Sequence, residues 1–62
     1  MKHTEAQYIN LGFKYETAKS VEAGTATAQA IRMLLEAERI DDRAEARYLI
    51  ERGRQEARGV SA

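Results

Sequence analysis

The chain has 62 residues, ten basic and ten acidic side chains that cancel, and neither cysteine nor proline. This length predicts a single small domain over residues 1–62, and the lack of cysteine excludes disulfides and thiolate-bound metals. A net charge of zero argues against broad binding to phosphates. Because no apolar run approaches the length of a membrane span, we expect a soluble, cytoplasmic protein.

The first predicted helix covers about residues 5–23. The segment Thr4-Glu5-Ala6-Gln7 has the pattern of a capping box, in which Thr4 caps the helix and the Gln7 side chain reaches back. Gly24 would supply the left-handed position that ends the helix.

Residues 8–15, "YINLGFKY", fit two structures. Read in twos they alternate as a half-buried strand does, whereas read in threes and fours Tyr8, Leu11, Gly12 and Tyr15 share one side of a helix. We predict the helix, in which Gly12 would allow a facing helix to approach closely. The two tyrosines then belong to the core.

The second predicted helix covers about residues 26–40, with Thr25 or Thr27 as its cap. Its apolar residues spread over more than half of the helical circumference, and only a narrow stripe is polar. This pattern predicts a central helix packed on two sides.

The third predicted helix covers about residues 43–58, and Asp42 would cap it with Glu45 as its reciprocal partner. A narrow apolar seam runs along it, formed by Ala46, Leu49, Ile50, Gly53 and Ala57. Because Gly53 and Ala57 are small and four residues apart, a neighbouring helix could come close there.

Tyr8-x-x-Leu11-Gly12-x-x-Tyr15 resembles the first helix of a tetratricopeptide repeat. The segment Ala30-x-x-x-Leu34-x-x-Ala37 is similar to the second helix of that repeat, and Asp42 to Ala46 to the start of a further one. The resemblance implies an all-α helical hairpin with a capping helix that binds other proteins. One such repeat ordinarily cannot bury a continuous core by itself, so it also implies an oligomer.

A second resemblance leads to a different function. "INLGFKY", followed by the Gly24 to Arg32 segment, looks like the strand, turn and second helix of ribbon-helix-helix regulators. Under this alternative the protein is a dimeric DNA-binding transcriptional regulator or antitoxin, and Asn10, Gly12 and Lys14 face the major groove. Nucleic acid is a partner only in this interpretation.

Two groups of residues are candidates for a protein-binding surface. Ile9 and Phe13 form a second apolar face on the first helix, and an arginine stripe follows the third, at Arg43, Arg47, Arg54 and Arg58. The stripe could orient an acidic partner, or it could be an ordinary solvated face.

Nothing in the chain predicts catalysis, a cofactor or a metal. His3 is the single histidine and has no companion ligands, and there is neither a phosphate-binding loop nor a nucleophile–base pair. We therefore expect a small non-enzymatic protein-interaction module of three helices. Its first partner would be a second copy of itself, bound through helix packing, and another protein could follow.

Overall fold

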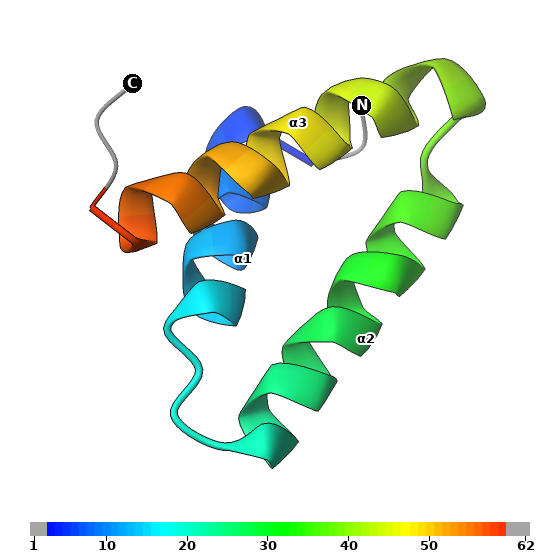
Figure 1. Cartoon of the computed structure of the whole chain (residues 1–62). Coiled ribbons are helices and arrows are strands. Elements are labelled where there is room, and N and C mark those ends of the chain that lie inside the picture. Colours follow the sequence, from blue (N-terminus) through cyan, green and yellow to red (C-terminus); the bar gives the residue numbers. More distant parts are fainter. Residues whose placement is uncertain (1–2, 60–62) are drawn as a thin grey trace.

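Three helices make up the computed structural model, which describes residues 3–59 (Figure 1). They are α1 (Glu5–Glu16), α2 (Val21–Ala37) and α3 (Ile40–Ala57), and residues 3–59 contain no strand. Residues 8–15 lie in α1, which confirms the helical prediction, whereas the strand required by the DNA-binding alternative is wrong. Within the described part of the chain, none of the helices could span a membrane.

Local hydrogen bonds determine where α1 begins and ends. The predicted capping box is present, because the Thr4 hydroxyl accepts from the Gln7 N–H and the Gln7 side chain accepts from the Thr4 N–H. The helix ends at Glu16 rather than near residue 23. At this end the Thr17 hydroxyl donates to the Phe13 carbonyl at 2.9 Å. Ser20 then caps a new helix by accepting from the Ala23 N–H.

Several predicted helix boundaries are therefore wrong, since α2 runs over Val21–Ala37 rather than about residues 26–40. Gly24, which was expected to end the first helix, lies inside α2, and Thr27 donates to the Ala23 carbonyl instead of capping. Similarly, α3 begins at Ile40 rather than 43, so Asp42 lies in its first turn. There its carboxylate interacts favourably with the positive end of the helix dipole, but it is not the N-cap.

The backbones of α1 and α3 touch where they cross. A Cβ atom built on Gly12 would overlap the carbonyl oxygen of Ile50, and one built on Gly53 would overlap the carbonyl oxygen of Ile9. Each helix therefore needs a glycine at the point that faces the other. The close approach predicted at Gly12 and at Gly53 is confirmed, and the helix that faces Gly12 is α3.

The core lies around this crossing. Its buried apolar side chains come from α1 and α3, namely Tyr8, Ala46, Leu49 and Ile50. From α2, Ile31, Leu34 and Leu35 pack against them and remain partly exposed. The predicted seam of the third helix and the core position of Tyr8 are confirmed.

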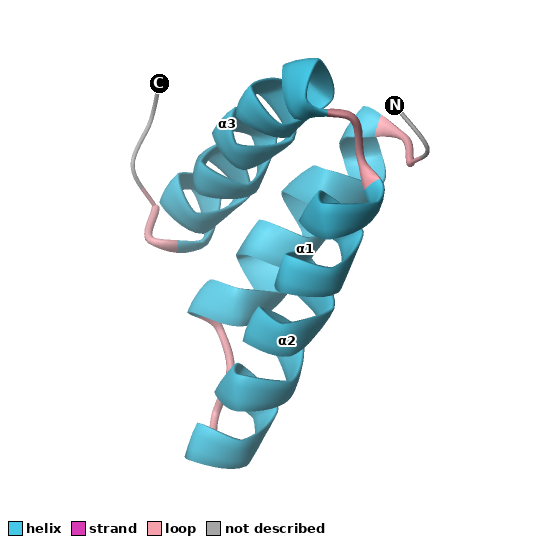
Figure 2. Ribbon diagram, turned by 90° about the vertical axis from the view of Figure 1, so that its right-hand side faces the viewer, coloured by secondary structure: helices cyan, strands magenta, loops and turns pink. Residues whose placement is uncertain are grey.

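Helix α2 occupies the edge of the molecule rather than its centre. The structure measures 30 × 29 × 14 Å, and α2 runs beside α1 and joins α3 through Glu38 and Arg39 (Figures 1 and 2). Thr27 is its single buried residue. The prediction of a central helix packed on two sides is wrong, because α1 and α3 form the main contact and leave much of the apolar circumference of α2 exposed.

The glycine crossing gives a direct test of the fold. Replacing Gly12 or Gly53 with alanine should lower the free energy of unfolding by about 1–3 kcal/mol, since the new methyl group must push two backbones apart. Thermal or urea denaturation followed by circular dichroism measures the change.

Gly24 is the matched control for that experiment. A Cβ atom there would meet nothing closer than the Ala18 Cβ at 3.8 Å, an ordinary contact. Gly24→Ala should therefore stabilise the protein by up to roughly 1 kcal/mol through better helix propensity. Equal effects of all three substitutions would contradict the tight crossing.

The buried Tyr8 hydroxyl predicts a loss of stability at high pH. Burial, followed by the nearby carboxylates of Glu38 and Asp42, raises the pKa of Tyr8 above its ordinary value of 10.0. The unfolded chain then releases this proton at lower pH than the folded protein does. This part of the stability is complete below pH 10 and is lost as the pH rises through the higher folded-state pKa.

Melting temperatures measured between about pH 9 and 11.5 should therefore fall less steeply for Tyr8→Phe than for the wild type. Tyr48 is 66% exposed, so Tyr48→Phe should keep the wild-type slope. Parallel curves for Tyr8→Phe and the wild type would show that ionisation of Tyr8 does not contribute to the loss of stability at high pH.

Candidate interaction surface

The four arginines predicted as one stripe have different surroundings. Arg43 is turned toward the end of α2, where its Nε donates to the carbonyl of Leu35 at 2.8 Å and to that of Glu38 at 3.2 Å. One of its terminal nitrogens donates to the carbonyl of Glu36 at 3.2 Å. Because these carbonyls lie at the end of α2, where no further turn follows, Arg43 caps that helix and holds it to α3.

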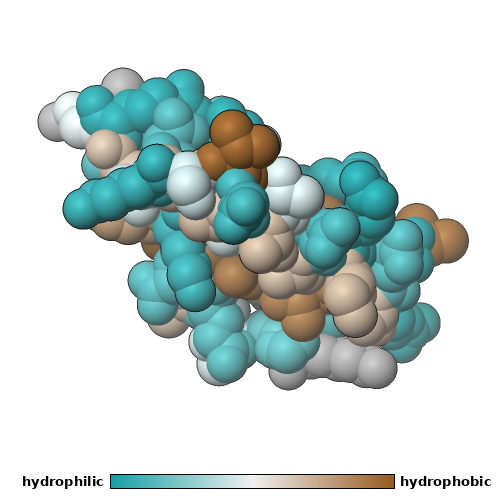
Figure 3. Space-filling view, turned by 90° about the horizontal axis from the view of Figure 1, so that it is seen from below, coloured by the Kyte–Doolittle hydropathy of each residue, from teal (hydrophilic) through white to brown (hydrophobic). Residues whose placement is uncertain are grey.

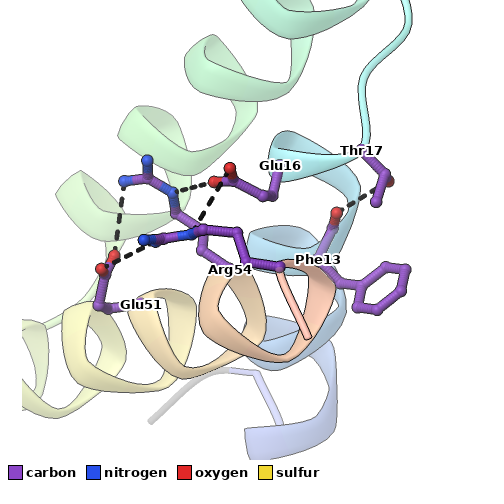
Figure 4. A network of polar contacts seen from close by, with 6 residues as sticks. Phe13, Glu16, Thr17, Glu51 and Arg54 are labelled. Atoms are coloured by element: carbon purple, nitrogen blue, oxygen red, sulfur yellow. Dashed lines mark hydrogen bonds and ion pairs between the residues drawn. The ribbon is translucent and has the colours of Figure 1, made fainter. Parts of the chain in front are cut away.

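Arg54 and Arg58 belong to a network of ion pairs with Glu16 and Glu51 (Figure 4). Glu16, at the end of α1, accepts from the Arg54 Nε at 2.9 Å and lies 3.5 Å from the Arg58 Nε. Glu51 lies 3.4 Å from Arg54 and 3.2 Å from Arg58. The Arg54 guanidinium also stacks 5.1 Å above the centre of the Tyr15 ring.

This network ties the end of α1 to α3. The hydrogen bond to Glu16 raises the pKa of Arg54, so its charge persists throughout the usual pH range. Since both guanidinium groups already face two carboxylates, an acidic ligand would have to compete with Glu16 and Glu51. Arg54 and Arg58 are consequently structural cations in the isolated chain.

Arg47 is exposed, and it forms no hydrogen bond or ion pair with the other residues of 3–59. With Arg43 it borders an open hollow of about 330 Å³ against Ile31 and Leu35 of α2. The structure therefore divides the stripe: within residues 3–59, Arg47 is its one arginine without a hydrogen-bond or ion-pair partner.

Ile9 and Phe13, predicted as an apolar binding face, lie on the side of α1 that meets Gly53. Ile9 is half-buried and packs against the core, and its carbonyl faces Gly53. Phe13 remains 45% exposed, and its ring points away from the ion-pair network (Figure 4). Helix α3 thus covers much of this face within the chain itself.

A run of exposed apolar side chains follows α2. We call it the α2 strip: Ala23, Ala26, Ala30, Met33 and Ala37. Met33 is 69% exposed, three of the alanines are exposed and Ala30 is half-exposed. Their spacing alternates between three and four residues, which places them in one straight row on a helix.

An open groove separates the α2 strip from α1. One part, of about 250 Å³, is lined by Leu11 and Lys14 of α1 and by Ala23, Ala26, Thr27 and Ala30 of α2. A second part shares Leu11 and Lys14 and continues along α1 past Gln7 toward Leu34. Apolar side chains also reach the surface as a band among hydrophilic ones in the view from below (Figure 3).

The two edges of the α2 strip differ in charge. Glu22, Gln29 and Glu36 are exposed and follow one edge, at the helical positions next to Met33 and Ala26. Across the groove the other edge is formed by α1 and carries Lys14. The strip is therefore an apolar row between an acidic edge and a basic edge.

Sequence reasoning did not identify this strip as a surface. Its residues from Ala26 onward were assigned to a helix packed on two sides, and Ala23 was assigned to the end of the first helix. The signal that could have found it is the even three–four spacing of residues 23–37, which is typical of a helix that meets one partner along a seam.

Two arginines of the stripe can be compared directly. Arg43→Ala should lower the melting temperature by several degrees, because three carbonyls lose their donor, and Arg43→Lys should recover little of the loss since one ammonium cannot reproduce this fork. Arg47→Ala should leave the melting temperature unchanged. A similar effect of both alanine substitutions would contradict the capping role of Arg43.

No family model, curated protein or solved structure matches this chain. The resemblances to tetratricopeptide repeats and to ribbon-helix-helix regulators gain no support from these comparisons. What stands is a small all-α chain of three helices with an exposed apolar strip.

Proposed function

We propose that the protein is a non-enzymatic interaction module that associates with a second copy of itself through the α2 strip. The observation that supports this proposal is the exposed row of apolar side chains on α2, flanked by the groove along α1. The core lies on another side of the same helix, so the strip is not needed to hold α2 in place.

The shape of the strip suits a helix as its occupant. Four of its five residues are alanine, and small side chains let two helix axes approach closely. The three–four spacing keeps the row facing one partner along the length of α2, and Met33 can adapt its shape to the surface opposite. Charged side chains stay at the edges, as in a typical interface.

A second copy is the occupant that the size of the chain favours. Among residues 3–59 the core contains four buried apolar side chains, which is small for a stable domain, and burial of the strip would add to it. A two-fold pairing also places the same small-residue row on both sides, so alanine meets alanine without a complementary pocket. Phe13 and Arg47 lie outside the strip, so they would stay accessible to another protein.

We therefore propose the α2 strip, rather than the predicted apolar face of α1, as the surface for self-association. Ile9 is packed within the chain, so replacing it would damage the fold and the association together. Residues of the α2 strip offer a cleaner experiment, because all but Ala30 are exposed.

Sedimentation equilibrium over a concentration series should show a reversible dimer for the wild type. The double variant Ala26→Gln/Met33→Gln should weaken the association at least roughly tenfold, since both copies lose apolar contacts. Its circular dichroism spectrum should stay that of a folded helical protein, because glutamine is a good helix former.

Val21→Gln is the matched control. Val21 is 86% exposed on the same helix, but it lies away from the strip. It should leave the dimer unaffected. A wild type that stays monomeric at several hundred micromolar would overturn the proposed self-association, whereas a dimer weakened only by Phe13→Gln would move the interface back to α1.

A further inference from the structure

We infer that the two copies pair with their α2 helices parallel and in register, and that Lys14 and Glu22 determine this direction. The inference rests on the proposed self-association and adds its geometry. It follows from the opposite charges on the two edges of the α2 strip.

The acidic edge is built from one side of α2. At 100° per residue, Glu22, Gln29 and Glu36 fall within an arc of roughly 40°, directly beside Met33. All three residues are exposed. The basic edge comes from the neighbouring helix, where exposed Lys14 borders the groove opposite Ala23, Ala26 and Ala30.

These charges are available to a partner. Among residues 3–59, neither Lys14 nor Glu22 takes part in an ion pair. Both sit at the rim of an apolar row, where opposite charges from a second molecule would meet in partly shielded surroundings.

Two-fold symmetry links the direction of pairing to the edges that meet. In an antiparallel, face-to-face pair, each edge lies against the same edge of the other copy. Glu22 would then approach Glu36 of the second copy, and the two Lys14 side chains would lie on the same side, so like charges repel. In a parallel pair the acidic edge of each copy lies against the basic edge of the other.

The position of Lys14 also sets the register. It borders the half of α2 that runs from Ala23 to Ala30. If equal residues of the strip lie opposite one another, Lys14 of one copy comes level with the first turns of α2 in the other, where Glu22 lies. The symmetry axis creates this contact twice, so a modest ion pair is doubled.

Charge reversal tests the pairing by sedimentation equilibrium. Lys14→Glu and Glu22→Lys should each weaken the dimer by roughly 3- to 20-fold, because each creates two like-charge contacts. An equimolar mixture of the two single variants should regain the wild-type affinity, since both contacts are then between opposite charges. Glu45→Lys, on an exposed part of α3, is the control and should change little.

An antiparallel dimer would behave differently. Lys14→Glu would leave two like charges on the same side and so change the affinity little, whereas Glu22→Lys would strengthen the dimer by placing a lysine opposite Glu36. These outcomes would overturn the parallel arrangement and leave the proposed self-association intact.

Distances between spin labels measure the direction independently. The chain contains no cysteine, so single labels can be attached at Thr25→Cys and at Arg39→Cys, exposed residues near the two ends of α2. A parallel dimer should give similar short distances at both sites. An antiparallel dimer centred on Ala30 should separate the two Arg39 labels by roughly 27 Å along the helix axis, which would defeat the inference. A monomer would instead defeat the proposed function itself.

Discussion

The fold depends on two helices crossing with nothing but glycine between their backbones. Gly12 and Gly53 face the carbonyls of Ile50 and Ile9, and this closeness brings the neighbouring turns of α1 and α3 into contact. Tyr8, one turn before Gly12, is fully enclosed at this contact. With larger residues at the crossing, the helices would separate and the side chains of Ala46, Leu49 and Ile50 would no longer fill the space between them. The two glycines thus bring the helices close enough for a small number of apolar side chains to fill the space between them.

Much of α1 and α3 could be predicted from local patterns. The Thr4–Gln7 capping box, the small residues at the crossing and the seam of the third helix each depend on neighbours within a few positions. The break after Glu16 could not, because Thr17 and Ser20 fit a continuing helix as well as a turn, and Gly24 looked like the better stop. Helical periodicity shows which side of a helix is apolar. It does not show whether the partner on that side belongs to the same molecule, and for that reason α2 was placed at the centre.

The arginines illustrate the same limit for the candidate site. Their common side of the third helix follows from spacing alone, but their roles follow from what the fold places within reach. Arg43 meets the carbonyls at the end of α2, while Arg54 meets Glu16, which is 38 positions away in the chain. Arg47 has the same chemistry and no such neighbour among residues 3–59. The contacts that separate structural cations from an available one are long-range, so no local pattern distinguishes them.

The crossing of α1 with α3 also has a consequence for how the chain folds. Its contacts join the beginning of the sequence to the end, and α2 lies wholly inside the loop that they close. To form these contacts the chain must lose the conformational entropy of that loop before most of the core is buried. We therefore expect it to fold more slowly than a bundle in which successive helices pair. A fragment lacking α1 or α3 would retain one half of the crossing and no enclosed side chains. Although the chain is built from three separate helices, we therefore expect them to fold as a single cooperative unit, whose core forms only after α3 has been synthesised.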